Sequence, residues 1–153
     1  MGSDFSTVGQ ADVDGRIVVV DDDPYVRRAL LRLLASVGYG VRTFSSSEEF
    51  LASCPALDLD CLILDVYLAG RSGIELYEHL AARGTPPPTV FITARDEAVA
   101  AVGLLPRPSR ISCLCKPFEG DELLVEVAGA LQQTRAVWGG ERPAQALPRP
   151  VGR

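Results

Sequence analysis

The stretch that decides the fold is residues 17–24, IVVVDDDP. Four consecutive apolar residues without polar alternation are typical of a parallel strand that is covered on both faces. Three aspartates follow where this strand ends. The last of them, Asp23, precedes Pro24, which indicates a helix N-cap followed by proline at the first helical position. The stretch therefore predicts a buried strand, an acidic turn and a helix, in that order.

The same arrangement recurs along the chain. CLILD at 61–65 and TVFIT at 89–93 are two more nearly continuous apolar segments. Five strands are predicted in all, over residues 16–20, 40–44, 61–64, 89–93 and 111–115. Short apolar strands that alternate with amphipathic helices predict an α/β fold, a doubly wound five-stranded parallel sheet of the (βα)5 kind.

Start and stop signals place the helices between these strands. The first helix begins after Asp23 and ends at Gly38. Ser46 with Glu49, and Ser72 with Glu75, have the spacing of a capping box. A last helix over about 119–134 carries one apolar stripe, formed by Leu123, Leu124, Val127 and Leu131.

Length and composition predict one domain with flanking segments. The chain has 153 residues, 47% of them apolar, which is enough to bury a core. We expect a flexible N-terminal segment over 1–15, the folded domain over 16–135, and a disordered tail or linker rich in proline and glycine over 136–153. No apolar run approaches the roughly 18 residues that span a bilayer, and the N-terminus lacks the pattern of a secretory signal. We therefore expect a cytoplasmic protein that makes no membrane contact.

The distribution of charge bears on nucleic-acid binding. The whole chain holds 15 basic and 20 acidic residues, of which four basic and one acidic lie from Arg135 onward. The first 134 residues therefore hold 11 basic and 19 acidic residues, a net charge of −8. An acidic body repels a phosphate backbone, so we expect no direct binding of nucleic acid by this domain.

Cysteine and histidine usage argues against a zinc site and a disulfide framework. The chain has one histidine, His79, and four cysteines without CxxC spacing, Cys54, Cys61, Cys113 and Cys115. We expect all four to be small buried or half-buried thiols.

Polar residues follow four of the predicted strands at their carboxyl ends. They are Asp21, Asp22, Asp65, Thr93 and Lys116. Parallel strands end at the same edge of a sheet, so these groups are expected to face one crevice. Several carboxylates there would repel one another, and a hard divalent cation such as Mg²⁺ would relieve the repulsion. Asp23 is assigned to the helix cap instead.

These segments together resemble a known family. The strings VVVDDDP (18–24), LILDVYLAGRSG (62–73) and VFITA (90–94), with KPF at 116–118, are similar to response-regulator receiver domains of bacterial two-component systems. The receivers of nitrogen-fixation and nodulation regulators are the most similar kind. The resemblance covers about 16–135, and it implies a flavodoxin-like sheet with strand order 2-1-3-4-5.

The resemblance also implies site residues and partners. Asp65 corresponds to the aspartate that accepts a phosphoryl group, and Thr93 and Lys116 to the residues that contact it. The implied ligands of Mg²⁺ are Asp21, Asp22, Asp65 and the backbone carbonyl of Tyr67. The implied donor is a sensor histidine kinase or a phosphotransfer protein, and a homodimer is a further expectation. Such a domain is a phosphoacceptor and not an enzyme.

Three departures from the family concern the output region. Cys113 occupies the place, three residues before the lysine, where the family usually has an aromatic switch residue. Pro106 and Pro108 are expected to shorten or divert the fourth helix, which begins at about residue 96. Tyr67 and Arg95 lie two residues past Asp65 and Thr93, at variable positions that influence phosphoryl lifetime in the family, so this lifetime is undetermined here.

Other functions stay open at this point. The altered switch region favours, as an alternative, a receiver-like module that binds partners without phosphorylation. A phosphatase with an aspartyl-phosphate would need a second aspartate two residues after the nucleophile, where this chain has Tyr67. The sequence does not identify the kinase or the stimulus, nor does it decide whether an output domain follows in a longer chain.

Overall fold

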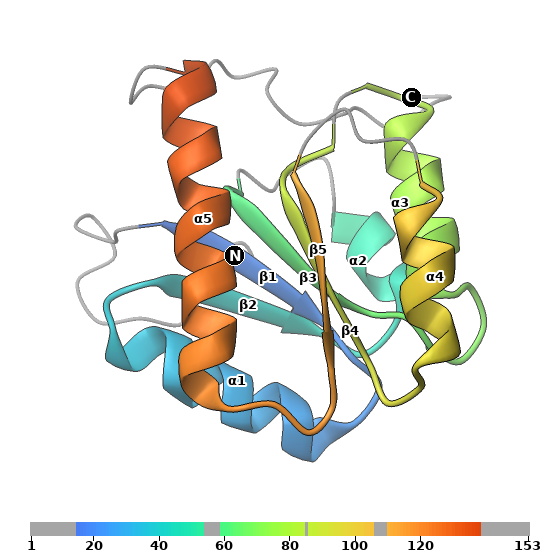
Figure 1. Cartoon of the computed structure of the whole chain (residues 1–153), viewed down its shortest axis with the longest axis horizontal. Coiled ribbons are helices and arrows are strands. Elements are labelled where there is room, and N and C mark those ends of the chain that lie inside the picture. Colours follow the sequence, from blue (N-terminus) through green and yellow to red (C-terminus); the bar gives the residue numbers. More distant parts are fainter. Residues whose placement is uncertain (1–14, 54–58, 85, 106–109, 139–153) are drawn as a thin grey trace.

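The computed structural model describes residues 15–53, 59–84, 86–105 and 110–138. Strands and helices alternate through this part of the chain (Figure 1). The elements are β1 (Arg16–Val20), α1 (Pro24–Ser36), β2 (Gly40–Phe44), α2 (Ser47–Ser53), β3 (Cys61–Asp65), α3 (Gly73–Ala81), β4 (Thr89–Thr93), α4 (Glu97–Gly103), β5 (Ile111–Cys115) and α5 (Gly120–Trp138).

The five strands form one parallel sheet in the order β2-β1-β3-β4-β5. Val20 at the end of β1 pairs with Phe44 of β2 and with Leu64 of β3, and Asp65 pairs with Ile92 of β4. The carboxyl ends of β1, β3 and β4 therefore lie together at one edge. The predicted doubly wound sheet and its strand order are confirmed.

The sheet separates two apolar cores. Helices α1 and α5 cover one face, and α2, α3 and α4 cover the other (Figure 1). Residues of β1 alternate between them, since Ile17 and Val19 join the α1/α5 core while Val18 and Val20 join the opposite one. All four are fully buried, which explains why residues 17–20 are all apolar.

The predicted bounds agree closely with the observed elements. Four strands have the predicted bounds, and β3 extends one residue further, to Asp65. Helix α5 runs to Trp138 and so continues past the predicted domain boundary at residue 135. At the other end, Gly15 is buried and its carbonyl accepts a hydrogen bond from the Gly40 amide at 2.8 Å. The rest of the two predicted terminal segments lies outside the described residues.

Helix α1 begins and ends as predicted. The Asp23 side chain accepts a hydrogen bond from the Tyr25 amide at 2.9 Å, and Pro24 is the first helical residue. Gly38 follows the helix with a φ of 100°, a conformation that side chains disfavour. The predicted reading of Asp23 as a cap is therefore confirmed.

One of the two predicted capping boxes is complete. At the start of α3, Ser72 accepts from the Glu75 amide and Glu75 accepts from the Ser72 amide. At the start of α2, the Glu49 amide does donate to the Ser46 hydroxyl, at 3.0 Å. The Glu49 carboxylate, however, accepts from the amide of Ser45, at 2.7 Å. The prediction of a second capping box is therefore wrong in one bond, because the Glu49 carboxylate accepts from the amide of Ser45 and not from that of Ser46.

The cysteines only partly match the expectation of buried thiols. Cys61 is buried and Cys113 half-buried, but Cys115 is exposed, and Cys54 lies outside the described residues. Cys115 is exposed because it ends β5, an edge strand of the sheet. Desolvation by burial raises the pKa of Cys61 to about 12, so this thiol stays protonated and unreactive.

Among the described residues, no helix is both long enough and apolar enough to cross a bilayer.

Candidate phosphoacceptor site

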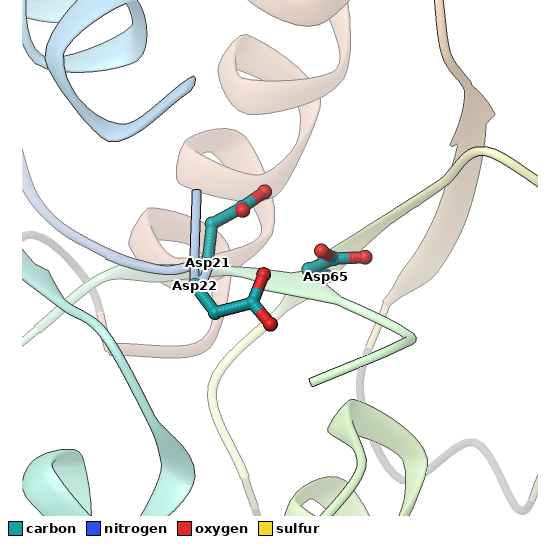
Figure 2. Close-up of side chains that lie close together, drawn as sticks. All are labelled: Asp21, Asp22 and Asp65. Atoms are coloured by element: carbon teal, nitrogen blue, oxygen red, sulfur yellow. The ribbon is translucent and has the colours of Figure 1, made fainter. Parts of the chain in front are cut away.

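Three carboxylates meet at the carboxyl edge of the sheet. Asp21 and Asp22 follow β1, and Asp65 ends β3, the neighbouring strand. One carboxylate oxygen from each lies within 4.8 Å of the others, and Figure 2 shows the three side chains around one small space. The predicted acidic cluster is thus present in the structure.

Lys116 adds a positive charge to this cluster. Its ammonium lies 3.2 Å from Asp21 Oδ2 and 3.5 Å from Asp65 Oδ2. Its backbone amide donates to the Thr93 carbonyl at 2.7 Å, which anchors the residue just after β5 to the end of β4. The ends of four strands therefore contribute to a single site.

Asp21 is held by contacts that the sequence did not reveal. The residue is fully buried, and its Oδ1 accepts from the Asp23 amide at 2.9 Å. Arg27, in the first half of α1, donates from Nη1 to the Asp21 carbonyl at 2.7 Å. Arg27 lies six residues after Asp21, and only the fold of the intervening turn brings its side chain back to the site.

The surroundings of Asp65 disfavour the ionised form of its carboxyl group. Burial, and then the neighbouring negative charge of Asp21, raise the pKa of Asp65 to about 6. Lys116 and the Tyr67 amide, which donates to Asp65 Oδ1 at 3.2 Å, act in the opposite direction. The side chain is only 8% exposed. It is therefore mostly ionised at neutral pH, and a further cation nearby would stabilise that charge.

Lys116 stays charged in this environment. Partial burial lowers its pKa, but the charges of Asp65 and Asp21 outweigh this effect, and the net shift is upward. The lysine is thus a permanent ammonium that neutralises only one of three neighbouring carboxylates.

The donor set fits Mg²⁺. Asp21, Asp22 and Asp65 offer hard oxygen ligands at the spacing of a single ion, and their charges exceed that of Lys116. Mg²⁺ prefers one to three carboxylates and keeps several waters. Asp22 is exposed, which leaves one side of the cluster open to water. These residues could therefore hold the ion, with the Tyr67 carbonyl as the remaining predicted ligand.

The loops after β3 and β4 contact each other above the site. The Arg95 guanidinium lies 4.7 Å from the centre of the Tyr67 ring, a cation–π contact, and 3.8 Å from Glu97. The buried Thr93 hydroxyl accepts from the Arg95 amide at 3.0 Å and donates to the Arg95 carbonyl at 3.3 Å. Thr93 therefore lies at the predicted strand end, and its hydroxyl forms hydrogen bonds with the backbone of the β4–α4 loop.

The predicted site residues divide into two groups. Asp21, Asp22, Asp65 and Lys116 lie together in one cluster, whereas the parts expected of Thr93 and of the Tyr67 carbonyl stay predictions. The Tyr67–Arg95 contact was missed. A signal for it was available, because each residue lies two positions past a site residue on neighbouring strands.

Comparison with known proteins agrees with this geometry. Residues 17–128 match the response regulator receiver domain family. The chain is 34% identical over 133 residues to the transcriptional regulatory protein FixJ of Bradyrhizobium diazoefficiens, with 87% of this chain and 64% of that protein covered. It is 35% identical over 126 residues to nodulation protein W of the same organism, with 82% and 55% covered. The predicted resemblance to nitrogen-fixation and nodulation regulators is confirmed.

Solved structures show the same similarity. Full-length FixJ from B. japonicum superposes with a TM-score of 0.74 at 33% identity, covering 82% of this chain and 62% of that one. A receiver protein from Burkholderia phymatum has a TM-score of 0.64 at 41% identity, covering 76% and 94%. The chain spans 64% of the length of curated FixJ and 55% of that of nodulation protein W. It belongs to the response-regulator receiver domains of two-component systems.

Proposed function

We propose that this domain accepts a phosphoryl group on Asp65 in a Mg²⁺-dependent transfer from a phosphohistidine. The donor is a sensor histidine kinase or a phosphotransfer protein, and the transfer takes place in the cytoplasm. One observation carries the proposal. The Asp65 carboxylate lies 3.5 Å from the Lys116 ammonium, and its oxygen lies within 4.8 Å of carboxylate oxygens of Asp21 and Asp22, close enough for one ion to bind all three. This arrangement combines a nucleophile with the charges that phosphoryl transfer requires.

The residues divide the chemistry between them. An Asp65 oxygen attacks the phosphorus in line, the P–N bond to the donor histidine breaks, and the imidazole keeps the electron pair and takes a proton. Lys116 stabilises an oxygen of the phosphoryl group, and Asp21 keeps Lys116 in place through its 3.2 Å contact. When bound, Mg²⁺ neutralises phosphoryl charge. The phosphoryl group remains on Asp65, so the domain is a phosphoacceptor and not an enzyme with turnover.

Phosphorylation then changes the contacts of the β4–α4 loop. The acyl phosphate adds a charge of about −1.5 to −2 close to Thr93. A Thr93 hydroxyl that donates to the phosphoryl group has to give up the hydrogen bond that it donates to the Arg95 carbonyl. The loop would move with it and switch contacts with other proteins, with a second copy of the chain or with an output domain.

An apolar groove beside Lys116 supports docking of the phosphohistidine protein. The groove, of about 360 Å³, lies between α1 and residues 116–120, and Ala29 and Phe118 are among its lining residues. Ala29→Glu should slow transfer from the protein donor at least tenfold and leave transfer from acetyl phosphate unchanged. Arg32→Ala, at an exposed position of the same helix outside the groove, is the control. Equal rates from the protein donor would contradict this docking surface.

The phosphoacceptor proposal is tested by intact mass after incubation with Mg²⁺ and acetyl phosphate. We expect a gain of one phosphoryl group, about 80 Da, that is absent from Asp65→Asn and from samples with EDTA. Lys116→Gln should react roughly 100-fold more slowly, because one stabilising charge is lost. No gain in a folded protein would favour the phosphorylation-independent module, and turnover of a generic phosphate ester would favour a phosphatase.

A further inference from the structure

Gly73 packs closely against the backbone at the end of β3. It is the first residue of α3, directly after the Ser72 cap. A Cβ placed on Gly73 would lie 2.2 Å from the Asp65 carbonyl oxygen, 3.0 Å from the Asp65 carbonyl carbon and 3.2 Å from Val66 Cα. All three are backbone atoms, so no side-chain rotation can make room.

Backbone conformation does not explain the glycine. Among the described residues, the glycines with positive φ are Gly38, Gly70 and Gly84, and Gly73 is not one of them. Alanine would also favour the helix, by up to about 1 kcal/mol over glycine in a helix interior. The close packing against the Asp65 backbone is therefore the feature that excludes a side chain at position 73.

The contact lies where the strand cannot easily yield. The Gly73 amide donates to the Val66 carbonyl at 3.0 Å, and the Val66 amide donates to the Ile92 carbonyl of β4 at 2.9 Å. The Asp65–Val66 backbone is thus held between α3 and the next strand. An ordinary contact distance begins at 3.4 Å and the added Cβ would lie at 2.2 Å, so α3 or the end of β3 must move by about 1.2 Å or more.

We infer that Gly73 is a positioning residue for Asp65. Its lack of a side chain lets α3 seat against the end of β3, and this contact sets where the Asp65 carboxylate stands relative to Asp21 and Lys116. The inference deepens the proposed function and rests on it. A misplacement of about 1 Å can cost on the order of 100-fold in rate, so the contact is close enough to matter for phosphoryl transfer.

The test compares Gly73→Ala with Gly103→Ala. A Cβ on Gly103, the last residue of α4, would meet no atom within 4 Å, so this variant controls for the substitution itself. With acetyl phosphate and Mg²⁺, we expect Gly73→Ala to be phosphorylated 10- to 100-fold more slowly and Gly103→Ala at the wild-type rate. Without Mg²⁺ or donor, the NMR signal of the Tyr67 amide, which bonds Asp65 Oδ1, should shift in Gly73→Ala alone.

A third variant separates positioning from loss of stability. Leu80→Ala removes a buried side chain from the same helix without adding an atom near Asp65. At a temperature where all variants are folded, it should keep the wild-type rate and Tyr67 signal. A Leu80→Ala defect equal to that of Gly73→Ala would overturn the inference, as would a normal rate and an unshifted Tyr67 signal in Gly73→Ala. Wild-type protein that takes no phosphoryl group would instead refute the proposed function, and the Tyr67 signal would still decide the place of Gly73.

Discussion

The charge of Asp65 opposes folding when no cation is bound. The side chain has a pKa of about 6 in the folded domain against 3.8 for an ordinary aspartate, through burial and then through repulsion by Asp21. Between these pH values the folded chain binds more protons than the unfolded one. The free energy of unfolding therefore falls as the pH rises from about 4 to 6.

Asp65→Asn should accordingly stabilise the metal-free protein at neutral pH. A rise of the pKa of Asp65 from 3.8 to about 6 corresponds to at most about 3 kcal/mol of stability. Water at the open edge of the site reduces this, so we expect a gain of about 1 to 2 kcal/mol at pH 7.5. Near pH 4 the gain should vanish, because the wild-type carboxyl is then protonated when folded. Urea denaturation of both proteins in EDTA at the two pH values measures this. An Asp65→Asn variant no more stable than wild type at pH 7.5 would contradict it.

At the level of single elements, the start of α3 links helix stability to the site. The capping box of Ser72 and Glu75 satisfies two amides that the first helical turn leaves free. The next residue is Gly73, whose contact with Asp65 depends on where the helix begins. A well-defined helix start therefore also contributes to the geometry around Asp65.

Ser72→Ala should lower the free energy of unfolding by about 1 kcal/mol, because it removes the cap of the Glu75 amide. The shift in the urea midpoint, with an unchanged m-value, is the appropriate measurement. Ser36→Ala serves as the comparison, since this exposed hydroxyl donates to the Leu33 carbonyl at the far end of α1 and should matter by less than about 0.5 kcal/mol. Equal losses in both variants would show that the box does not stabilise α3.

The positions of the strands and helices could be predicted from the sequence more readily than the contacts between them. The strands could be predicted because uninterrupted apolar runs such as 17–20 need burial on both faces, and local signals such as Asp23–Pro24 mark helix starts. The fourth helix is short, as predicted, and ends at Gly103. The end of α5 was predicted about four residues too early, at Thr134, although the glycines at 139 and 140 directly follow Trp138 and are a helix-stop signal in the sequence.

The acidic cluster was predictable for a topological reason. Parallel strands end at one edge, so Asp21, Asp65 and Lys116 had to meet once the strand order was right. Two contacts could not be predicted: the hydrogen bond from Arg27 to the Asp21 carbonyl, and the close packing of Gly73 against Asp65. Each depends on how a helix packs against a strand end to within about an ångström. A single sequence does not distinguish a glycine required by contact from one that is merely tolerated.

For the molecule as a whole, Mg²⁺ binding at the proposed site should raise the global stability. Its ligands come from segments that are close only in the folded sheet, so Mg²⁺ should bind the folded state alone. At a free Mg²⁺ concentration 100 times the dissociation constant, the domain should gain about 2.7 kcal/mol. Melting or urea curves with MgCl₂ against NaCl of matched ionic strength would measure this gain.

Asp21→Asn should abolish most of that gain, because it removes one of the three clustered carboxylates. Asp23→Asn is the matched control in the same turn, since asparagine also caps a helix and Asp23 is not part of the cluster. A Mg²⁺ response that survives in Asp21→Asn, or that is lost in Asp23→Asn, would contradict the assigned ligands.

The pairing of Lys116 with Asp21 joins residues 95 positions apart in the chain. A ribosome working at about 5 to 20 residues per second needs roughly 5 to 20 s to cover that interval. During this time the nascent chain already holds the acidic residues after β1, and later Asp65, without the ammonium that offsets them. The acidic cluster is thus among the last parts of the domain to be completed during synthesis, and a shortened translation product ending before β5 would lack both Lys116 and an edge strand of the sheet.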